Sequence, residues 1–468
     1  MPDDPITPPT PTGRARRCVQ YAAATAAAVV VAWLFLGYAP PERRTYPGRE
    51  KVIFWHMWTS NWADVINDIV ERFNTSQDRY EVVPLIITGG GAVRGGSVGS
   101  SLKTLIATAG GDPPDCMGQW EQVIPAWAER GVLTPLDELM TPDEWSDLRD
   151  RLYPAVRAIG TYKGRFYGLS TGMNTWAIYY RPSHFVEAGL DPNRFPETLE
   201  ALDQVAEQLY CYDEAGNITR IGFMPEWLIQ WIAVFGGSLY DAGADRITLT
   251  HPRNVAALTW MRGCNDKYGY EKVLRFKTGL PSTMAANWPF ISGAFSIVVD
   301  GQWRVEQLRQ YAPELDYRTA PIPAPAGGKP LACWSNGNFM VIPSKAKNKQ
   351  GAMAFMRFWS GVDDPKRAAE FYTWGGWLPI VPEIAQAPIY QAYLKKYPAF
   401  RTFVKIMASP NVQVTPPVLV QRYLLNRLTW AEEAACRAVV SPRQALEAVG
   451  KEVDRELRNM RLPSGRPK

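Results

Sequence analysis

Residues 51–74 read KVIFWHMWTSNWADVINDIVERFN and contain the first strand–helix unit of the chain. The opening KVIFW is rich in β-branched and aromatic residues, which is typical of a buried strand. Ser60 and Asn61 suit the first position of a helix. From residue 63 onward, apolar residues recur at helical spacing and give the predicted helix one apolar face. They are Val65, Ile66, Ile69, Val70 and Phe73.

The same alternation continues beyond this unit. YEVVPLII (80–87) predicts a second strand, and SLKTLIATAG (101–110) predicts a second amphipathic helix. Further on, the pattern predicts a strand leading into a helix at 176–190, a helix at 198–210 and a buried strand at 295–303, with late helices at 351–361 and 442–457. Alternating strands and helices predict an α/β fold with a parallel sheet and helices on its faces.

The composition is that of an ordinary globular chain without a basic surface. The chain has 468 residues, 46% of them hydrophobic and 21% charged, and a formal net charge of +5. Residues 1–51 carry +3 and residues 457–468 carry +4, so the body between them carries −2. Because nucleic-acid binding needs a concentration of Lys and Arg, this balance argues against such a partner.

Histidine and cysteine are too scattered to form a metal site. The three histidines are far apart in sequence, and no C-x-x-C pattern is present. We therefore expect neither a metal nor a cofactor. Five of the six cysteines lie in the body, an odd number that does not suit a full disulfide framework.

The N-terminus has the pattern of an export signal or a membrane anchor. Residues 1–18 are rich in proline and contain three arginines, which predicts a disordered tail. Residues 19–39 carry no charge and are long enough to span a bilayer. Because Pro40 follows the candidate cleavage site, we expect an uncleaved signal anchor with the body outside the cytoplasm; a cleaved signal peptide is the alternative. Residues 40–50 are predicted to be a linker.

Several blocks carry a resemblance to a known family, and they occur in the order that the family shows. They are VIFWHMW (52–58), AGGDPPDCMGQW (109–120), the block from 162 to 202 with its EAGLD motif, FISGAFSIVVDGQW (290–303), APIPAPAGGKP (320–330), KNKQGAMAFMRFW (347–359) and GGWLPIVPEI (375–384). From about Lys51 to Leu457 the chain resembles the extracellular solute-binding proteins of the sugar-binding class, the maltose-binding-protein-like receptors of ABC transporters.

The resemblance implies two α/β lobes with a ligand cleft between them. Lobe 1 would hold residues 51–170 and 332–398, and lobe 2 would hold 171–331 and 399–460, followed by a C-terminal tail at 461–468. It also implies a monomeric, non-enzymatic receptor that delivers a sugar or oligosaccharide to ABC permease subunits. The expected location is periplasmic or extracellular, with the N-terminal segment anchoring the chain to the membrane.

Tryptophans beside polar residues are the candidate ligand-binding residues. Sugars present flat C–H faces that pack on indole rings, while their hydroxyl groups need fixed polar partners. The predicted ligand-binding residues are Trp58, Gln119, Trp120, Asn174, Glu226, Trp227, Asp300, Trp303, Trp334 and Trp377. The resemblance places Trp58, Trp120, Trp303 and Trp377 at loop positions that face the cleft. The alternative for each ring is packing in the core.

Two other function classes stay open at this point. Residues 168–172 (GLSTG) fit the G-x-S-x-G pattern of a hydrolase, but a strand-like segment follows where a helix is required. Glu121, Glu226 and Asp300 supply carboxylates for a glycosidase. A receptor for a polyol phosphate or a polyamine is the third possibility, with Arg94 and Arg422 as candidate anion ligands. The glycine-rich stretch 89–100 lacks the P-loop Lys and predicts a loop at the cleft mouth.

Overall fold

The computed structural model describes residues 44–59, 61–87, 98–281 and 285–461. The chain divides into two compact units, Met1–Pro47 and Gly48–Lys468. Residues 44–47, the described part of the first unit, form no helix or strand. The predicted tail and anchor (1–39) and most of the glycine-rich stretch lie outside the described residues. Within the described residues, no helix is both long enough and apolar enough to cross a membrane.

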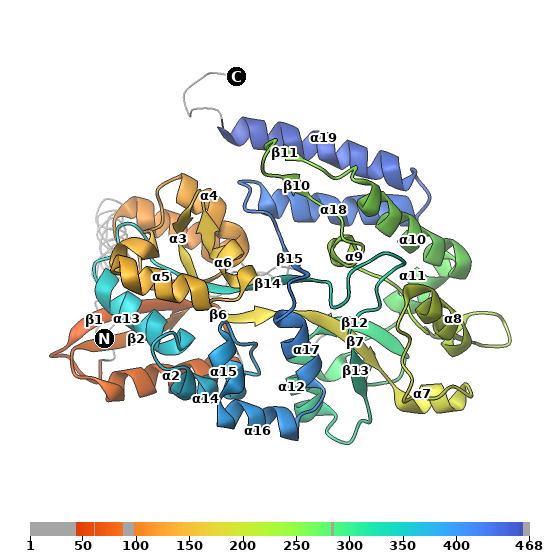
Figure 1. Cartoon of the computed structure of the whole chain (residues 1–468), viewed down its shortest axis with the longest axis horizontal. Coiled ribbons are helices and arrows are strands. Elements are labelled where there is room, and N and C mark those ends of the chain that lie inside the picture. The colour runs from red at the N-terminus through yellow and green to blue at the C-terminus, as the bar shows by residue number, and fades with distance from the viewer. Residues whose placement is uncertain (1–43, 60, 88–97, 282–284, 462–468) are drawn as a thin grey trace, which may run out of the picture. The chain divides into compact units, whose positions relative to one another are not determined.

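The larger sheet of the second unit has β14 in a central position (Figure 1). Its strands are β1 (Glu50–His56), β2 (Tyr80–Ile86), β3 (Cys116–Trp120), β6 (Gly168–Asn174), β14 (Cys333–Val341) and β15 (Val412–Val414). β1 is parallel to β2, as predicted, and it is also parallel to β3, a strand that the sequence did not predict. β14 runs antiparallel to β3 and β6 and parallel to β15. The sheet is therefore mixed, whereas the strand–helix alternation predicted a parallel one.

The helices α2 (Asn61–Ser76) and α13 (Lys349–Ser360) pack on this sheet. Four of the five predicted apolar residues of α2 are buried, and Val65 is partly buried. Phe54 of β1 contacts Phe355 and Trp359 of α13, with ring centroids 5.2 and 6.0 Å apart. Each fully buried side chain of this size contributes about 1.5–3 kcal/mol, so the apolar face of α2 is a large part of what holds it there.

A second, three-stranded sheet contains β12 (Ile297–Gly301), β7 (Trp176–Tyr180) and β13 (Arg318–Ala320), with β7 between the other two. All of its pairings are antiparallel. Only Thr175 separates β6 of the first sheet from β7 of the second, so the chain crosses there between the two sheets. It returns between β13 and β14. The lobe boundaries predicted at residues 170 and 331 lie near these crossings and stay predictions.

Six further helices of the described chain lie around the site described below or pack against the helices that line it. They are α8 (Leu199–Leu209), α9 (Leu228–Val234), α10 (Pro252–Tyr268), α11 (Tyr270–Thr278), α18 (Gln421–Cys436) and α19 (Pro442–Arg461). α18 and α19 lie side by side, and α18 also contacts α9 and α10 (Figure 1). The predicted helices at 198–210, 351–361 and 442–457 are confirmed.

The remaining elements are short. They are α3 (Val98–Gly110), η1 (Glu121–Val123), α4 (Ile124–Glu129), η2 (Leu136–Leu139), α5 (Pro142–Arg151), α6 (Pro154–Gly160), β4 (Thr161–Tyr162), β5 (Arg165–Phe166), α7 (Pro182–Glu187), β8 (Cys211–Tyr212), β9 (Ile218–Arg220), β10 (Tyr240–Asp241), β11 (Arg246–Ile247), η3 (Ala285–Asn287), α12 (Trp303–Tyr311), α14 (Pro365–Gly375), α15 (Pro382–Gln386), α16 (Pro388–Lys396) and α17 (Phe400–Met407).

A buried carboxylate ties α12 to the group of helices α14–α16. Glu306 of α12 accepts a hydrogen bond of 2.6 Å from the hydroxyl of Tyr393 on α16. Gly376 ends α14 in the left-handed conformation, with φ +62°. A Cβ atom on Gly376 would lie 2.3 Å from Cγ of Glu306, so only glycine allows this close approach.

Gly376→Ala should therefore destabilise the protein more than the same substitution at a left-handed glycine with open space around it. Gly189 has φ +73° and open space around its Cβ position, so Gly189→Ala isolates the backbone strain, about 1–2 kcal/mol. Gly376→Ala should add about 1–3 kcal/mol from the steric overlap with Glu306. Urea unfolding of both variants measures the difference, and equal losses would contradict the packing at Glu306.

Candidate functional site: a tryptophan-lined pocket

A cavity of about 840 Å³ lies between α9, α11 and α18, within the size range of small-molecule sites. The segment that leads into α9 supplies Glu226 and Trp227, and β14 supplies Trp334. Three of the predicted ligand-binding residues therefore line one pocket. α11 adds Lys277, and α18 adds Glu432 and Glu433.

Trp176 joins the aromatic residues at this pocket into one cluster. Its ring stacks on Trp334 with centroids 4.8 Å apart, and it meets Trp227 and Trp303 edge-on at 5.7 Å each. Trp176 itself is 2% exposed, whereas Trp227 is 44% exposed. The structure thus brings together the predicted residues Trp227, Trp303 and Trp334 through a fourth tryptophan that the predicted set lacked. Its position next to Asn174, at the crossing between the sheets, is the signal in the sequence that points to it.

Trp227 has a strained backbone for a tryptophan. Its φ and ψ are 68° and 79°, in the left-handed region, which costs a residue with a Cβ about 1–2 kcal/mol. The backbone N–H groups of Trp227 and Leu228 donate to the two carboxylate oxygens of Glu432, at 3.1 and 2.8 Å. The indole N–H of Trp231 donates to the carbonyl of Glu226 at 2.9 Å. A strained and exposed aromatic residue that is held by several bonds is typical of a functional site.

A network of buried side-chain amides fixes the backbone where the chain crosses from β6 to β7, beside the tryptophans. Gln302 donates to Oδ1 of Asn174 at 2.8 Å, and Asn174 donates in turn to Oδ1 of Asn336 at 2.9 Å. The N–H of Thr175 donates to Gln302 at 3.3 Å. Asn174 was predicted to contact the ligand, and in this conformation both ends of its amide are bonded within the protein. These bonds tie β6 to β14 and to Gln302, which lies between β12 and α12.

The two other predicted acceptors also have protein partners. Glu226 forms an ion pair with Lys277 of α11. Asp300 accepts from Arg304 at 2.8 Å and from the N–H of Gly301 at 2.8 Å. Burial raises the pKa of Asp300, and the adjacent Arg304 guanidinium offsets part of that rise. Asp300 therefore bridges β12 to α12 and does not line the pocket.

The remaining predicted residues do not line this pocket; they lie in the larger sheet or against it. Trp58 and Trp377 each contact Trp359, with ring centroids 5.6 Å apart in both pairs. The Trp58 ring lies over Gly118, where a Cβ would come within 2.5 Å of it. Gln119 is buried in β3, and Trp120 is partly buried at the end of that strand. None of these four residues lines the pocket.

Glu121 is a buried carboxylate that the predicted site did not include. It is 2% exposed, and neither of its oxygens has a hydrogen bond of good geometry within the described part of the chain. Burial raises its pKa from 4.5 to about 7, although nearby N–H groups of Glu121 and Gly337 offset part of the rise. η1, which contains Glu121, packs against α18 and β14. The feature of the sequence that points to Glu121 is its position directly after Trp120, at the end of a strand.

The G-x-S-x-G pattern does not form a nucleophile elbow. Ser170 lies inside β6 and is fully buried. Its hydroxyl donates to the carbonyl of Asn338 at 3.0 Å and accepts from the N–H of Gly172 at 3.1 Å. The strand-to-helix turn that exposes such a serine is absent at this point. Among the described residues, no group of His, Cys, Asp and Glu is arranged to hold a metal ion.

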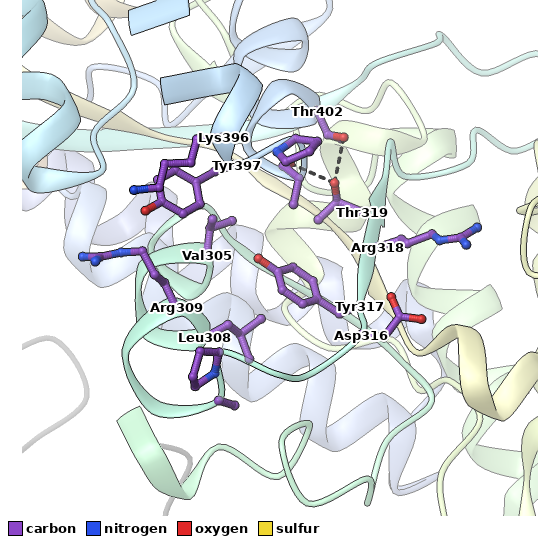
Figure 2. Close-up of a pocket in the computed structure, with 14 residues that line it drawn as sticks. Val305, Leu308, Arg309, Asp316, Tyr317, Arg318, Thr319, Lys396, Tyr397 and Thr402 are labelled. Atoms are coloured by element: carbon purple, nitrogen blue, oxygen red, sulfur yellow. Dashed lines mark hydrogen bonds between the residues drawn. The ribbon is translucent and has the colours of Figure 1, made fainter. Parts of the chain in front are cut away.

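A second cavity, of about 750 Å³, lies between α12, β13 and the segment that links α16 to α17 (Figure 2). Several of its polar groups are bonded within the protein: Arg309 pairs with Glu306, and Thr319 bonds to Thr402, both at 2.8 Å. None of the predicted ligand-binding residues lines it. The tryptophan-lined pocket is therefore the candidate site.

Glu121→Gln should stabilise the protein at high pH and have little effect at low pH. A carboxylate whose folded pKa is raised destabilises the fold as pH rises from its unfolded pKa of 4.5 to its folded pKa of about 7. The variant should gain about 3 kcal/mol relative to the unaltered chain between pH 5 and 9, measured by urea unfolding. Glu447→Gln, at an exposed ion pair with Lys451, should show no such gain. A constant difference across this range would contradict the burial of Glu121.

The comparisons with known proteins agree on one kind of protein. The maltotriose-binding protein of Pyrococcus abyssi (strain GE5 / Orsay) is 23% identical over 354 residues, which cover 73% of this chain and 69% of that protein. The sn-glycerol-3-phosphate-binding periplasmic protein UgpB of Escherichia coli (strain K12) is 20% identical over 371 residues, which cover 76% and 80%.

Solved structures match the fold as well. The structure of CpMnBP1 with mannotriose bound is similar with a TM-score of 0.72 and 27% identity, covering 86% of this chain and 100% of that chain. The cyclic alpha-maltosyl-1,6-maltose binding protein from Arthrobacter globiformis has a TM-score of 0.70 at 21% identity, covering 88% and 100%. The predicted α/β fold class is confirmed. A family model described as bacterial extracellular solute-binding protein matches residues 92–402. The chain therefore belongs to the bacterial extracellular solute-binding protein family.

Proposed function

We propose that this chain is the substrate-binding component of an ABC importer and that it binds a sugar or oligosaccharide at the tryptophan-lined pocket. The observation that carries the proposal is Trp227, a strained and 44% exposed ring in a pocket backed by Trp176 and Trp334. An indole face suits the C–H face of a pyranose. The polar groups of α18 at the pocket, among them Asn426 and Thr429, suit its hydroxyl groups.

The charge of the pocket favours a neutral ligand over a phosphate. Its acidic lining residues are Glu226, Glu432 and Glu433, and its basic lining residue is Lys277, which is paired with Glu226. An anionic ligand would meet a net negative site with no converging Arg or Lys. A polyol phosphate, the ligand type that UgpB is named for, is therefore a poorer match than the oligosaccharides of the other relatives.

A polyamine is a poorer match for a related reason. Each acidic residue of the pocket already has a partner in the protein. Glu226 pairs with Lys277, Glu432 accepts from two backbone N–H groups, and Glu433 pairs with Arg437 at 3.2 Å. Recruiting these carboxylates to a cationic ligand would break existing bonds.

Two of the residues that the sequence offered for a hydrolase, Ser170 and Asp300, do not line this pocket. Ser170 is buried in a strand, and Asp300 is bonded to Arg304. We therefore propose a non-enzymatic receptor. Its ligand would be recognised at the pocket by rings and amides, and ABC permease subunits would receive the ligand from it.

The proposal extends to closure and location. Closure of two lobes on the ligand would bring the predicted residues in or against the larger sheet toward the pocket; these are Trp58, Gln119, Trp120 and Trp377. Permease subunits would then read the closed state, which the ligand favours by binding it more tightly. We propose a monomer outside the cytoplasm, attached to the membrane through residues 19–39.

Titration with sugars tests the function directly. Mannotriose, maltotriose and their monosaccharides should change the tryptophan emission of the protein, because Trp227 and its neighbours line the pocket. Trp227→Ala should weaken binding about tenfold or more, or ~1.4 kcal/mol. Trp430→Ala is the matched control, because Trp430 is a 40% exposed tryptophan of α18 that does not line the pocket. No response to any carbohydrate would refute the sugar assignment.

The strained backbone at Trp227 leads to a second prediction. Trp227→Gly and Trp227→Ala both remove the ring, but only the glycine variant also relieves the left-handed backbone. The glycine variant should be more stable than the alanine variant by about 1 kcal/mol, while both lose affinity alike. Urea unfolding and sugar titration of the pair measure the two effects. A less stable glycine variant would mean that the backbone at residue 227 is not strained.

A further inference from the structure

We propose that Glu432 of α18 is a positioning residue that sets the orientation of Trp227 and so the affinity for ligand. The inference rests on the proposed function for its effect on affinity. Its structural part, the restraint of Trp227, stands on the hydrogen bonds alone.

Two backbone N–H groups at the start of α9 depend on Glu432. Helices leave their first N–H groups without partners inside the helix, and a polar side chain at the preceding position usually supplies an acceptor. Trp227 holds that position in α9, and its side chain accepts no such bond. The Glu432 carboxylate supplies both acceptors instead, one oxygen to Trp227 and the other to Leu228.

Packing alone does not hold the Trp227 ring. The side chain is 44% exposed, and its ring meets Trp176 edge-on, with centroids 5.7 Å apart. The left-handed backbone at Trp227 is costly and persists only where its surroundings impose it. Of the bonds around this turn, the Trp231 indole fixes Glu226, and Glu432 fixes Trp227 itself.

The restraint comes from a distant part of the sequence. Glu432 is 205 residues from Trp227 along the chain, on a helix that also lines the pocket. The position of α18 and the direction of the Trp227 ring are therefore linked through one carboxylate. A ligand that stacks on Trp227 binds a ring that has already been ordered, so less conformational entropy is lost on binding.

Affinity measurements on Glu432 variants test the effect on the ligand. Glu432→Ala should weaken mannotriose or maltotriose binding about tenfold, and Glu432→Gln, which keeps one carbonyl acceptor, should weaken it less. Glu452→Ala is the matched control, because it also removes a carboxylate bonded to α18, at 2.7 Å from Arg427, but outside the pocket. Its affinity should be unchanged. Should Glu432→Ala unfold, the glutamine variant carries the comparison.

A double-mutant cycle separates positioning from direct contact. If Glu432 acts only through Trp227, adding Glu432→Ala to Trp227→Ala should cause no further loss of affinity. Additive losses would mean that Glu432 binds the ligand itself, and this result would overturn the proposal.

Hydrogen exchange of the free protein tests the restraint without any ligand. In the unaltered full chain the amides of Trp227 and Leu228 should be protected, and Glu432→Ala should speed their exchange at least tenfold relative to amides in the centre of α18. Unchanged protection would overturn the inference even if sugars bind. Lost protection in a protein that binds no sugar would sustain the restraint and refute only the proposed function.

Discussion

The arrangement of the described fold depends on the pairing of β14 with strands from three other parts of the chain. β14 bonds to β3, β6 and β15, and eight of its nine residues are buried. β3 brings the parallel strands β1 and β2 to it, and β6 leads through Thr175 into β7 of the second sheet. Because β14 carries both Trp334 and Asn336, the same strand that completes the larger sheet also places the aromatic and amide groups beside the pocket.

The pocket combines a rigid base with one exposed ring. Trp176 and Trp334 are buried and stacked, and the bonds of Asn174 and Gln302 fix the backbone that carries Trp176. Trp227 is different, because it is exposed and its backbone is strained. Proteins keep such strain where the surrounding structure imposes it, commonly at binding sites. The contrast between buried tryptophans that pack and one that is held out for contact is the physical basis of the proposed sugar site.

The charge of the pocket favours some of the candidate ligands over others. The pocket is acidic overall, yet its carboxylates are bonded to Lys277, Arg437 and the start of α9. These bonds leave aromatic faces and uncharged polar groups for a ligand. The relatives include receptors named for an oligosaccharide and for a polyol phosphate, so family membership alone does not decide between them. The absence of converging basic groups at the described pocket does favour the neutral ligand.

The sequence by itself determined the α/β class, the parallel strands β1 and β2 and the apolar face of α2, because these features follow from local periodicity. It also identified Trp227, Trp303 and Trp334 as members of a tryptophan set. Only the tertiary structure decided which rings meet. Trp176 joins those three, whereas Trp58 and Trp377 pack on Trp359. It likewise decided that Asp300 faces Arg304 and that Glu432 supports Trp227. The physical reason is that periodicity reports which face of an element is buried, while partners 100 or 200 residues apart are chosen by how the sheets and helices pack.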